Sequence, residues 1–174
     1  MKKICVPILC VLLTLCIALS AALVLRVRED RRDEKLYMKR MFSAFNDILL
    51  ESKTLARSEI VPEKRAEGFI YLHCALRNAA EEIEDGYRFV SEKVPGVTAL
   101  WFDAKAAEIS AGMPDFLTGA GDLTPQGRAF LNDLNAEMNA LLDPLLDTDG
   151  LNLNETLSIN EFAVVLSTFY SSRS

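Results

Sequence analysis

An uncharged apolar run constrains this chain more than any other feature of its sequence. The 22 residues from Ile4 to Leu25 contain no charged side chain, and Lys2 and Lys3 precede them. A helix of this length is about 33 Å long, which matches the hydrocarbon core of a bilayer. We therefore predict an N-terminal transmembrane helix, a signal-anchor over residues 1–25 that contacts membrane lipid through residues 4–25.

A cleavable signal peptide is the alternative for this segment, and it would give a secreted domain. Residues 20–22, Ser-Ala-Ala, are small residues of the kind that precede a cleavage site. However, the apolar run continues through Leu23 and Leu25. Its total length favours an anchor that stays attached.

The charges on either side of the run give conflicting signals about the side of the membrane on which the domain lies. Seven basic residues lie between Arg26 and Arg40, against two before the run, and the positive-inside rule would place such a segment in the cytoplasm. A Lys-Lys start before an apolar run is instead typical of anchors that export the rest of the chain. We predict an extracytoplasmic domain, with the cytoplasmic side as the alternative.

The rest of the chain fits one acidic domain. Without Lys2 and Lys3, 17 basic and 25 acidic side chains remain, a formal charge of −8. We divide this part into a charged juxtamembrane segment, residues 26–35, and a domain over residues 36–174. About 150 residues are enough for an independent core. The negative charge disfavours nucleic acid as a partner, because such binding depends on neutralising phosphates.

The spacing of apolar residues in this domain predicts helices. They recur at steps of three and four and not of two, which indicates an all-α fold without strands. We expect a small antiparallel helical bundle of about five helices. The first helix carries a seam from Met38 to Leu55, interrupted by Ser52, and is expected to run unbroken out of the membrane helix.

Proline and glycine mark the ends of the other helices. Pro62 is expected to begin the second helix, whose apolar seam runs from Phe69 through Tyr87 to Val94. The third is predicted from Thr98 to Ala111, before Gly112 and Pro114. Its inward face would consist of Leu100, Ala104, Ala107 and Ala111. The fourth begins at Thr124-Pro125 and ends near Asp143-Pro144, and the last begins near Ile159.

The segment over residues 147–161 superficially resembles a calcium-binding loop. If Glu161 takes the twelfth position, Gly150 and Glu155 fall where an EF-hand needs an oxygen ligand and a glycine. The alternative is a capping box, with Ser158 as N-cap and Glu161 three residues later as its partner. We predict the capping box and leave a divergent cation site open.

His73 is the only histidine, so a Ser-His-Asp or Cys-His arrangement would have to include it. Cys74 is its neighbour, but adjacent residues point about 100° apart on a helix and cannot bind one metal together. We expect His73 to be a packed or half-exposed helix residue and Cys74 to be buried. We identify no catalytic residue, no metal ligand and no cofactor-binding residue.

Two further clusters have simple structural explanations. In the acidic run from Glu81 to Asp85, Glu81 lies four positions from Arg77 and Glu84 four from Arg88, which predicts a salt-bridged surface. A di-metal bundle site would need a Glu-x-x-His pair, which the sequence lacks. The glycines at 119 and 121 are flanked by aspartates and do not form a phosphate-binding turn.

These features predict a single-pass, membrane-anchored helical domain that is not an enzyme. It would act as an interaction or scaffold protein. The seam from Met38 to Leu55 would pair with a protein partner or a second copy, or be buried within its own bundle, which gives the same pattern. We identify no small molecule and no nucleic acid as ligand. The alternative is an extracytoplasmic sensor, or a small-ligand or cation-binding bundle, with its pocket near the loop from Gly112 to Leu123.

Overall fold

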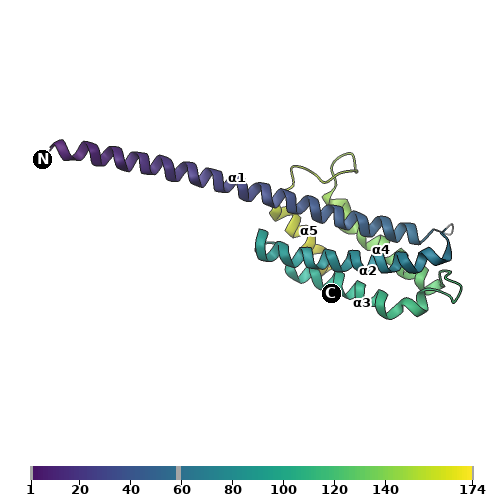
Figure 1. Cartoon of the computed structure of the whole chain (residues 1–174). Helices are drawn as coiled ribbons and strands as arrows, with labels where there is room; N and C mark the ends of the chain where they lie inside the picture. Colours follow the sequence, from purple (N-terminus) through teal and green to yellow (C-terminus); the bar gives the residue numbers. More distant parts are fainter. Residues whose placement is uncertain (1, 58–59, 174) are drawn as a thin grey trace.

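The computed structural model describes the backbone of residues 2–57 and 60–173, and side chains from residue 13 onward within these ranges. Five α-helices form a bundle, which confirms the predicted all-α fold (Figure 1). They are α1 (Lys2–Leu55), α2 (Pro62–Asp85), α3 (Ala99–Phe116), α4 (Pro125–Leu142) and α5 (Ile159–Ser171). Within the described ranges no strand forms, and only two isolated β-bridges, Leu117–Leu123 and Leu146–Leu153, are present.

The first helix is continuous over 54 residues, from Lys2 to Leu55, as the sequence predicted. Its N-terminal part projects away from the bundle, and its C-terminal part packs along α2 and α4 (Figure 1). Every described side chain from residue 13 to residue 33 is exposed, and burial begins with Tyr37 and Met38. One helix therefore contributes both the projecting segment and part of the bundle core.

Among the residues whose side chains the structure describes, no helix is long and apolar enough to cross a membrane. Residues 1–12 of the predicted anchor have no described side chains, so that part of the prediction lies outside the described residues. The transmembrane helix and signal-anchor over residues 1–25 have no support from the structure and stay a prediction.

The second helix packs antiparallel to α1, and Pro62 begins it as predicted. The predicted seam is wrong at Tyr87, whose side chain is 51% exposed. Gly86 instead takes the buried position beside α1, three residues after the buried Ile83. A π-helical turn, Gly86–Val90, follows α2.

The third helix differs from the prediction in its length and in its buried face. It continues past Gly112 to Phe116 with Pro114 inside it, because a proline two residues from the end removes only one hydrogen bond. The predicted inward face is exposed, including Leu100 at 57%. The buried residues are Ala99, Trp101, Phe102, Ala106, Ile109 and Phe116.

Aromatic side chains from several helices join in the core. Phe45 of α1 stacks on Phe102 of α3 with ring centroids 5.3 Å apart, and Phe116 stacks on Phe130 of α4 at 4.8 Å. Such rings bury the largest apolar areas of any side chains. Their burial explains why the aromatic face of α3, and not its alanine face, faces the core.

The loop between α3 and α4 is held against α2 by a buried arginine. The side chain of Arg65 is 6% exposed, and its Nη1 lies 3.1 Å from Oδ1 of Asp122. Its guanidinium also donates to the carbonyl oxygens of Gly121 and Arg57. After this loop Thr124 caps α4 by accepting a hydrogen bond from the Gly127 amide over 3.0 Å, as predicted.

Candidate functional site

His73 connects α2 to α3. Its Nδ1 lies 2.9 Å from the carbonyl oxygen of Ala106 and 3.1 Å from Oγ of Ser110. Because a carbonyl only accepts, Nδ1 carries the proton and cannot draw one from the Ser110 hydroxyl. The nearby carboxylate of Asp103 is paired with Arg77, 3.0 Å away. These residues therefore form a polar contact between two helices and not an activated nucleophile.

Cys74 is exposed, so the prediction that it is buried is wrong. The adjacent positions on α2 that face the core are Leu72 and Leu76, and Cys74 lies on the opposite side of the helix. Three- and four-residue spacing alone did not distinguish the two faces, because Cys74, Ala75 and Leu76 are all apolar.

The capping box predicted before α5 is present. The Glu161 amide donates to Oγ of Ser158 over 3.3 Å, and the Ser158 amide donates to Oε2 of Glu161 over 2.8 Å. The Ser158 backbone and side-chain hydrogen bonds lower the pKa of the Glu161 carboxyl. This carboxylate therefore serves as the hydrogen-bond acceptor for the N-cap amide at the start of α5.

The carboxylate of Asp147 also accepts backbone hydrogen bonds, within the loop that precedes α5. Its Oδ1 accepts hydrogen bonds from the amides of Leu151 and Asn152, at 3.1 and 3.3 Å. These bonds lower the pKa of the Asp147 carboxyl. Among the residues that the structure describes, no three His, Cys, Asp or Glu side chains converge to hold a metal ion.

The acidic residues of α2 divide between two environments. Arg77 lies 3.8 Å from Glu81, and Arg88 lies 3.1 Å from Glu84, so the predicted salt-bridged pairs are present. Glu82 and Asp85, from the same run, instead line a pocket against α1. The sequence pattern did not reveal this second environment.

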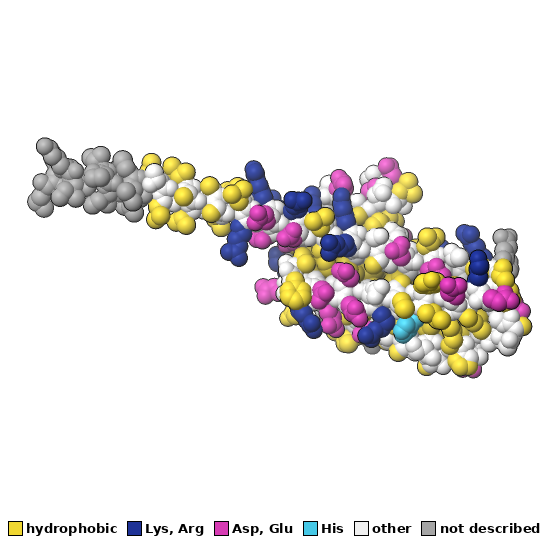
Figure 2. Space-filling model, in the orientation of Figure 1, with side chains coloured by type: hydrophobic (Ala, Val, Ile, Leu, Met, Phe, Trp, Pro, Cys, Tyr) yellow, Lys and Arg dark blue, Asp and Glu magenta, His cyan; other side chains and the backbone are white. Residues whose placement is uncertain are grey.

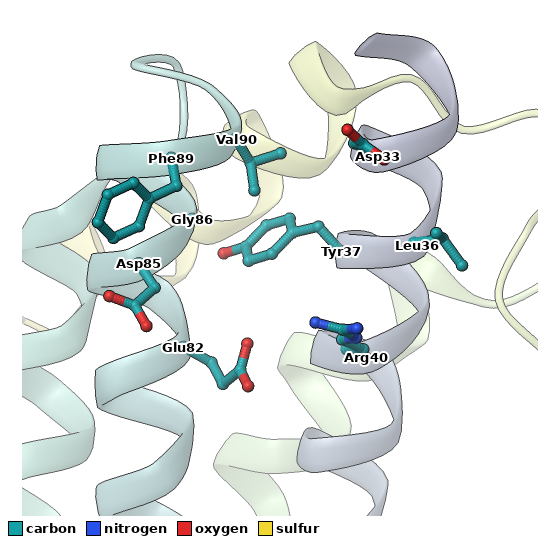
Figure 3. Close-up of a pocket in the computed structure, with 9 residues that line it drawn as sticks. All are labelled: Asp33, Leu36, Tyr37, Arg40, Glu82, Asp85, Gly86, Phe89 and Val90. Carbon is teal, nitrogen blue, oxygen red and sulfur yellow. The ribbon is translucent and has the colours of Figure 1, made fainter. Parts of the chain in front are cut away.

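The pocket lies between α1 and the end of α2, where the projecting segment enters the bundle (Figure 3). Its volume is about 370 Å³. The lining residues are Asp33, Leu36, Tyr37, Arg40, Glu82, Asp85, Gly86, Phe89 and Val90. Three carboxylates and one guanidinium give it a formal charge of −2, and Phe89 and Val90 supply apolar surface.

Tyr37 extends across this pocket from α1, and its hydroxyl points toward the α2 wall formed by Glu82, Asp85 and Gly86 (Figure 3). The residue is only 4% exposed. Within the described part of the chain, its buried Oη has no hydrogen-bond partner. Most buried polar groups in folded proteins have a partner, so this hydroxyl is an exception that needs an explanation.

Gly86 makes this position of Tyr37 possible. A Cβ at residue 86 would overlap the Tyr37 ring and its hydroxyl. Burial raises the pKa of Tyr37, and the nearby charge of Glu82 raises it further. The phenol therefore stays neutral and keeps both its proton and its acceptor lone pairs.

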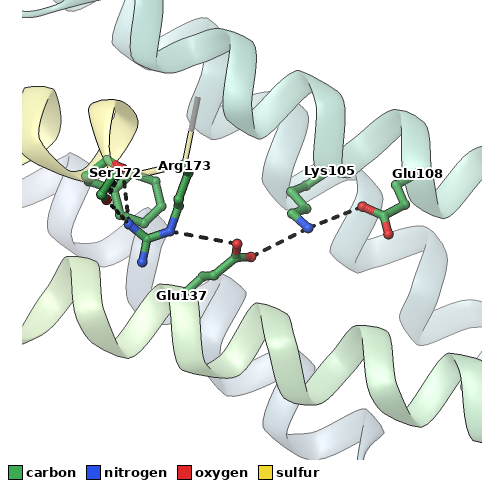
Figure 4. A network of polar contacts seen from close by, with 6 residues as sticks. Lys105, Glu108, Glu137, Ser172 and Arg173 are labelled. Carbon is green, nitrogen blue, oxygen red and sulfur yellow. Dashed lines mark hydrogen bonds and ion pairs between the residues drawn. The ribbon is translucent and has the colours of Figure 1, made fainter.

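A second polar network lies on another side of the bundle and joins three helices (Figure 4). Glu137 of α4 lies 3.5 Å from Nζ of Lys105 on α3 and 3.7 Å from Nε of Arg173, which follows α5. Arg173 also donates to the carbonyl oxygen of Phe169 over 3.0 Å. Each charge in this network has an opposite partner, so it stabilises the packing of α3, α4 and the C-terminal turn.

The comparisons with known proteins found no relative: no family model, no curated sequence and no solved structure matches this chain. We therefore infer its function from its own residues.

Proposed function

We propose that this protein is a single-pass membrane protein whose helical bundle acts as a non-catalytic interaction domain. The observation that supports this most strongly is the continuity of α1. The helix that contains the apolar run also supplies Met41, Phe45 and Ile48 to the bundle core, where all three are fully buried. A partner bound to the bundle would thus be held at a fixed distance and angle to the N-terminal segment.

The charged segment after the apolar run fits a position at the membrane surface. Five basic residues lie between Arg26 and Lys35, all of them exposed, and Figure 2 shows basic side chains around α1 where it meets the bundle. Basic residues are attracted to the anionic headgroups of a cytoplasmic leaflet by about 1 kcal/mol each, which favours the cytoplasmic side. The acidic residues between them reduce this attraction. We propose an extracytoplasmic domain, with the cytoplasmic side as the alternative.

The partner would contact a surface other than the seam from Met38 to Leu55. Met38, Met41, Phe45, Ile48 and Leu55 are all buried within the bundle of their own chain. Exposed apolar side chains remain on α2 and α3, including Ile70, Tyr71 and Leu100. We propose a protein or a second copy as partner, bound through exposed faces of the bundle.

The membrane anchor is tested by placing a charge in the apolar run. Leu19→Arg is expected to release the full chain from membranes into the soluble fraction on alkaline carbonate extraction, because arginine is costly at the centre of a bilayer. The matched control is Leu151→Arg, at a loop residue that is 75% exposed, which should stay with the membrane. Equal extraction of the wild type and both variants would contradict an anchor.

The interaction role and the side of the membrane need separate measurements. Chemical cross-linking in native membranes should give a complex larger than the monomer, and a monomer alone would count against the role.

Protease treatment of intact cells should remove a C-terminal tag from an extracytoplasmic domain. Protection of the tag until the cells are opened would place the domain in the cytoplasm.

A further inference from the structure

We propose that the pocket around Tyr37 binds the ammonium group of an organic cation. This gives the ligand-binding alternative a site different from the expected one, because the loop from Gly112 to Leu123 is held by Arg65. The inference does not depend on a protein partner for the bundle. It uses the proposed membrane anchor only for one of the two possible sources of the ligand.

The charge of the pocket favours a cation. Asp33 and Arg40 line it from α1, and Glu82 and Asp85 line it from α2 (Figure 3). One guanidinium can balance one carboxylate, so the charge of two carboxylates remains for a ligand. Charged ligands are attracted into clefts lined by the opposite sign of charge.

The Tyr37 hydroxyl is an independent indication that the pocket binds a polar ligand. It is buried at the α2 wall of the pocket and has no partner among the described residues. An ammonium N–H donated to its oxygen would satisfy it as an acceptor. The same ammonium has further hydrogens to donate to the carboxylates of Glu82 and Asp85.

Apolar residues beside the carboxylates indicate that the cation carries an organic part. Leu36 and Val90 line the pocket, and the ring of Phe89, which is 79% exposed, lies at its edge. An aromatic face attracts ammonium groups, and alkyl carbons pack on aliphatic side chains. A metal ion fits less well, since no metal-holding cluster forms among the described residues.

The ammonium can belong to a free amine or to a lipid headgroup. Asp33 lies eight residues beyond Leu25, which is about 12 Å along a helix. If residues 4–25 span a bilayer, the pocket would therefore lie near the headgroups of the same leaflet. Both sources present the same positively charged group to the same side chains.

The experiment measures binding of n-butylammonium to the full chain in maltoside micelles by ligand-observed NMR. Sodium chloride at the same ionic strength serves as the reference, because salt screens non-specific attraction. We expect a saturable dissociation constant of about 1 mM. Glu82→Gln and Asp85→Asn should each weaken binding about tenfold or more, and Tyr37→Phe about fivefold, through the loss of one hydrogen bond.

The matched control is Glu81→Gln, which removes a carboxylate of the same helix that does not line the pocket. It should bind n-butylammonium as the wild type does. Circular dichroism of each variant checks that the bundle is folded. The proposal is overturned if the wild type shows no saturable binding, if butyrate binds better than n-butylammonium, or if Glu81→Gln weakens binding as much as Glu82→Gln.

A second arm identifies the source of the ammonium. The same titration is repeated in maltoside micelles that contain lysophosphatidylethanolamine, whose headgroup carries a primary ammonium. Weaker apparent binding of n-butylammonium there, with the Glu82→Gln effect retained in maltoside alone, supports a site filled by a headgroup. Unchanged binding supports a site for a free amine. Neither result depends on the Leu19→Arg extraction, so failure of the site and failure of the anchor are distinguishable.

Discussion

The hydroxyl of Ser52 on α1 donates a hydrogen bond over 2.6 Å to the side-chain oxygen of Asn135 on α4. Ser52 is fully buried, in the middle of an otherwise apolar seam. The contact joins two helices that are 83 residues apart at this point. It therefore fixes the relative position of α1 and α4 in a way that apolar packing does not.

Ser52→Ala should destabilise the bundle by about 1 kcal/mol, because it removes the hydrogen bond between the buried Ser52 hydroxyl and the half-buried Asn135 side chain. The measurement is the urea midpoint of the full chain in detergent, followed by circular dichroism. Replacing both residues, Ser52→Ala with Asn135→Leu, should cost less than the sum of the single changes. Strict additivity would show that the two side chains do not interact.

Gly86→Ala should destabilise the bundle by about 1–3 kcal/mol through overpacking, since the new methyl group overlaps the Tyr37 ring. This effect is opposite to the gain that alanine normally brings to a helix. Gly119→Ala is the control, because a Cβ there meets nothing within 4 Å. A thermal unfolding midpoint raised by Gly86→Ala would mean that Tyr37 does not occupy this position.

The Tyr37 phenol should make stability fall at alkaline pH. Its pKa is raised in the folded chain, by burial and then by Glu82, whereas the unfolded phenol ionises near pH 10, as is typical for tyrosine. Below about pH 10 the phenol is neutral in both the folded and the unfolded chain, so it does not change stability. Above that pH the phenol ionises in the unfolded chain first, and the free energy of unfolding falls as the pH rises.

Tyr37→Phe tests this difference, because it removes the ionisable group and keeps the ring. At pH 7 the variant should be as stable as the wild type or more stable, since it removes an unpartnered buried hydroxyl. Between about pH 10 and 11 the wild type should lose more stability than Tyr37→Phe. Parallel urea-unfolding curves over that pH range would contradict the burial of the hydroxyl.

Helix type and most helix starts could be predicted from the sequence because they depend on local chemistry. Pro62, Thr124 and Ser158 act at helix starts through their own backbone and nearest turn, so a single sequence was enough. The inward face of α3 was predicted wrongly, although Trp101 and Phe102 are buried as expected of large aromatic side chains. Apolar residues surround that helix, and the choice of Phe102 over Leu100 depends on aromatic rings from other helices.

The pocket could not be predicted for a similar reason. Glu82 and Asp85 belong to an acidic run in which Glu81 and Glu84 form ordinary surface ion pairs. Glu82 and Asp85 differ from Glu81 and Glu84 only because they face α1, which lies about 45 residues away in sequence. Periodicity reports on one helix at a time, whereas the pocket depends on how α1 and α2 pack and on the close approach of Tyr37 to Gly86.

Ser158→Ala should destabilise the bundle by about 1 kcal/mol at neutral pH, because it removes the side-chain cap of α5. The difference in the free energy of unfolding between Ser158→Ala and the wild type should shrink in acid. The backbone and side-chain bonds of Ser158 lower the pKa of Glu161, so their stabilisation is present above the ordinary pKa of glutamate and is lost as the pH falls through the lowered value. The urea midpoint at pH 7 and at about pH 3 measures both effects. Ser167→Ala, an exposed change within α5, should shift neither, and an equal loss at both pH values would show that the Ser158 hydroxyl does not bond the Glu161 carboxylate.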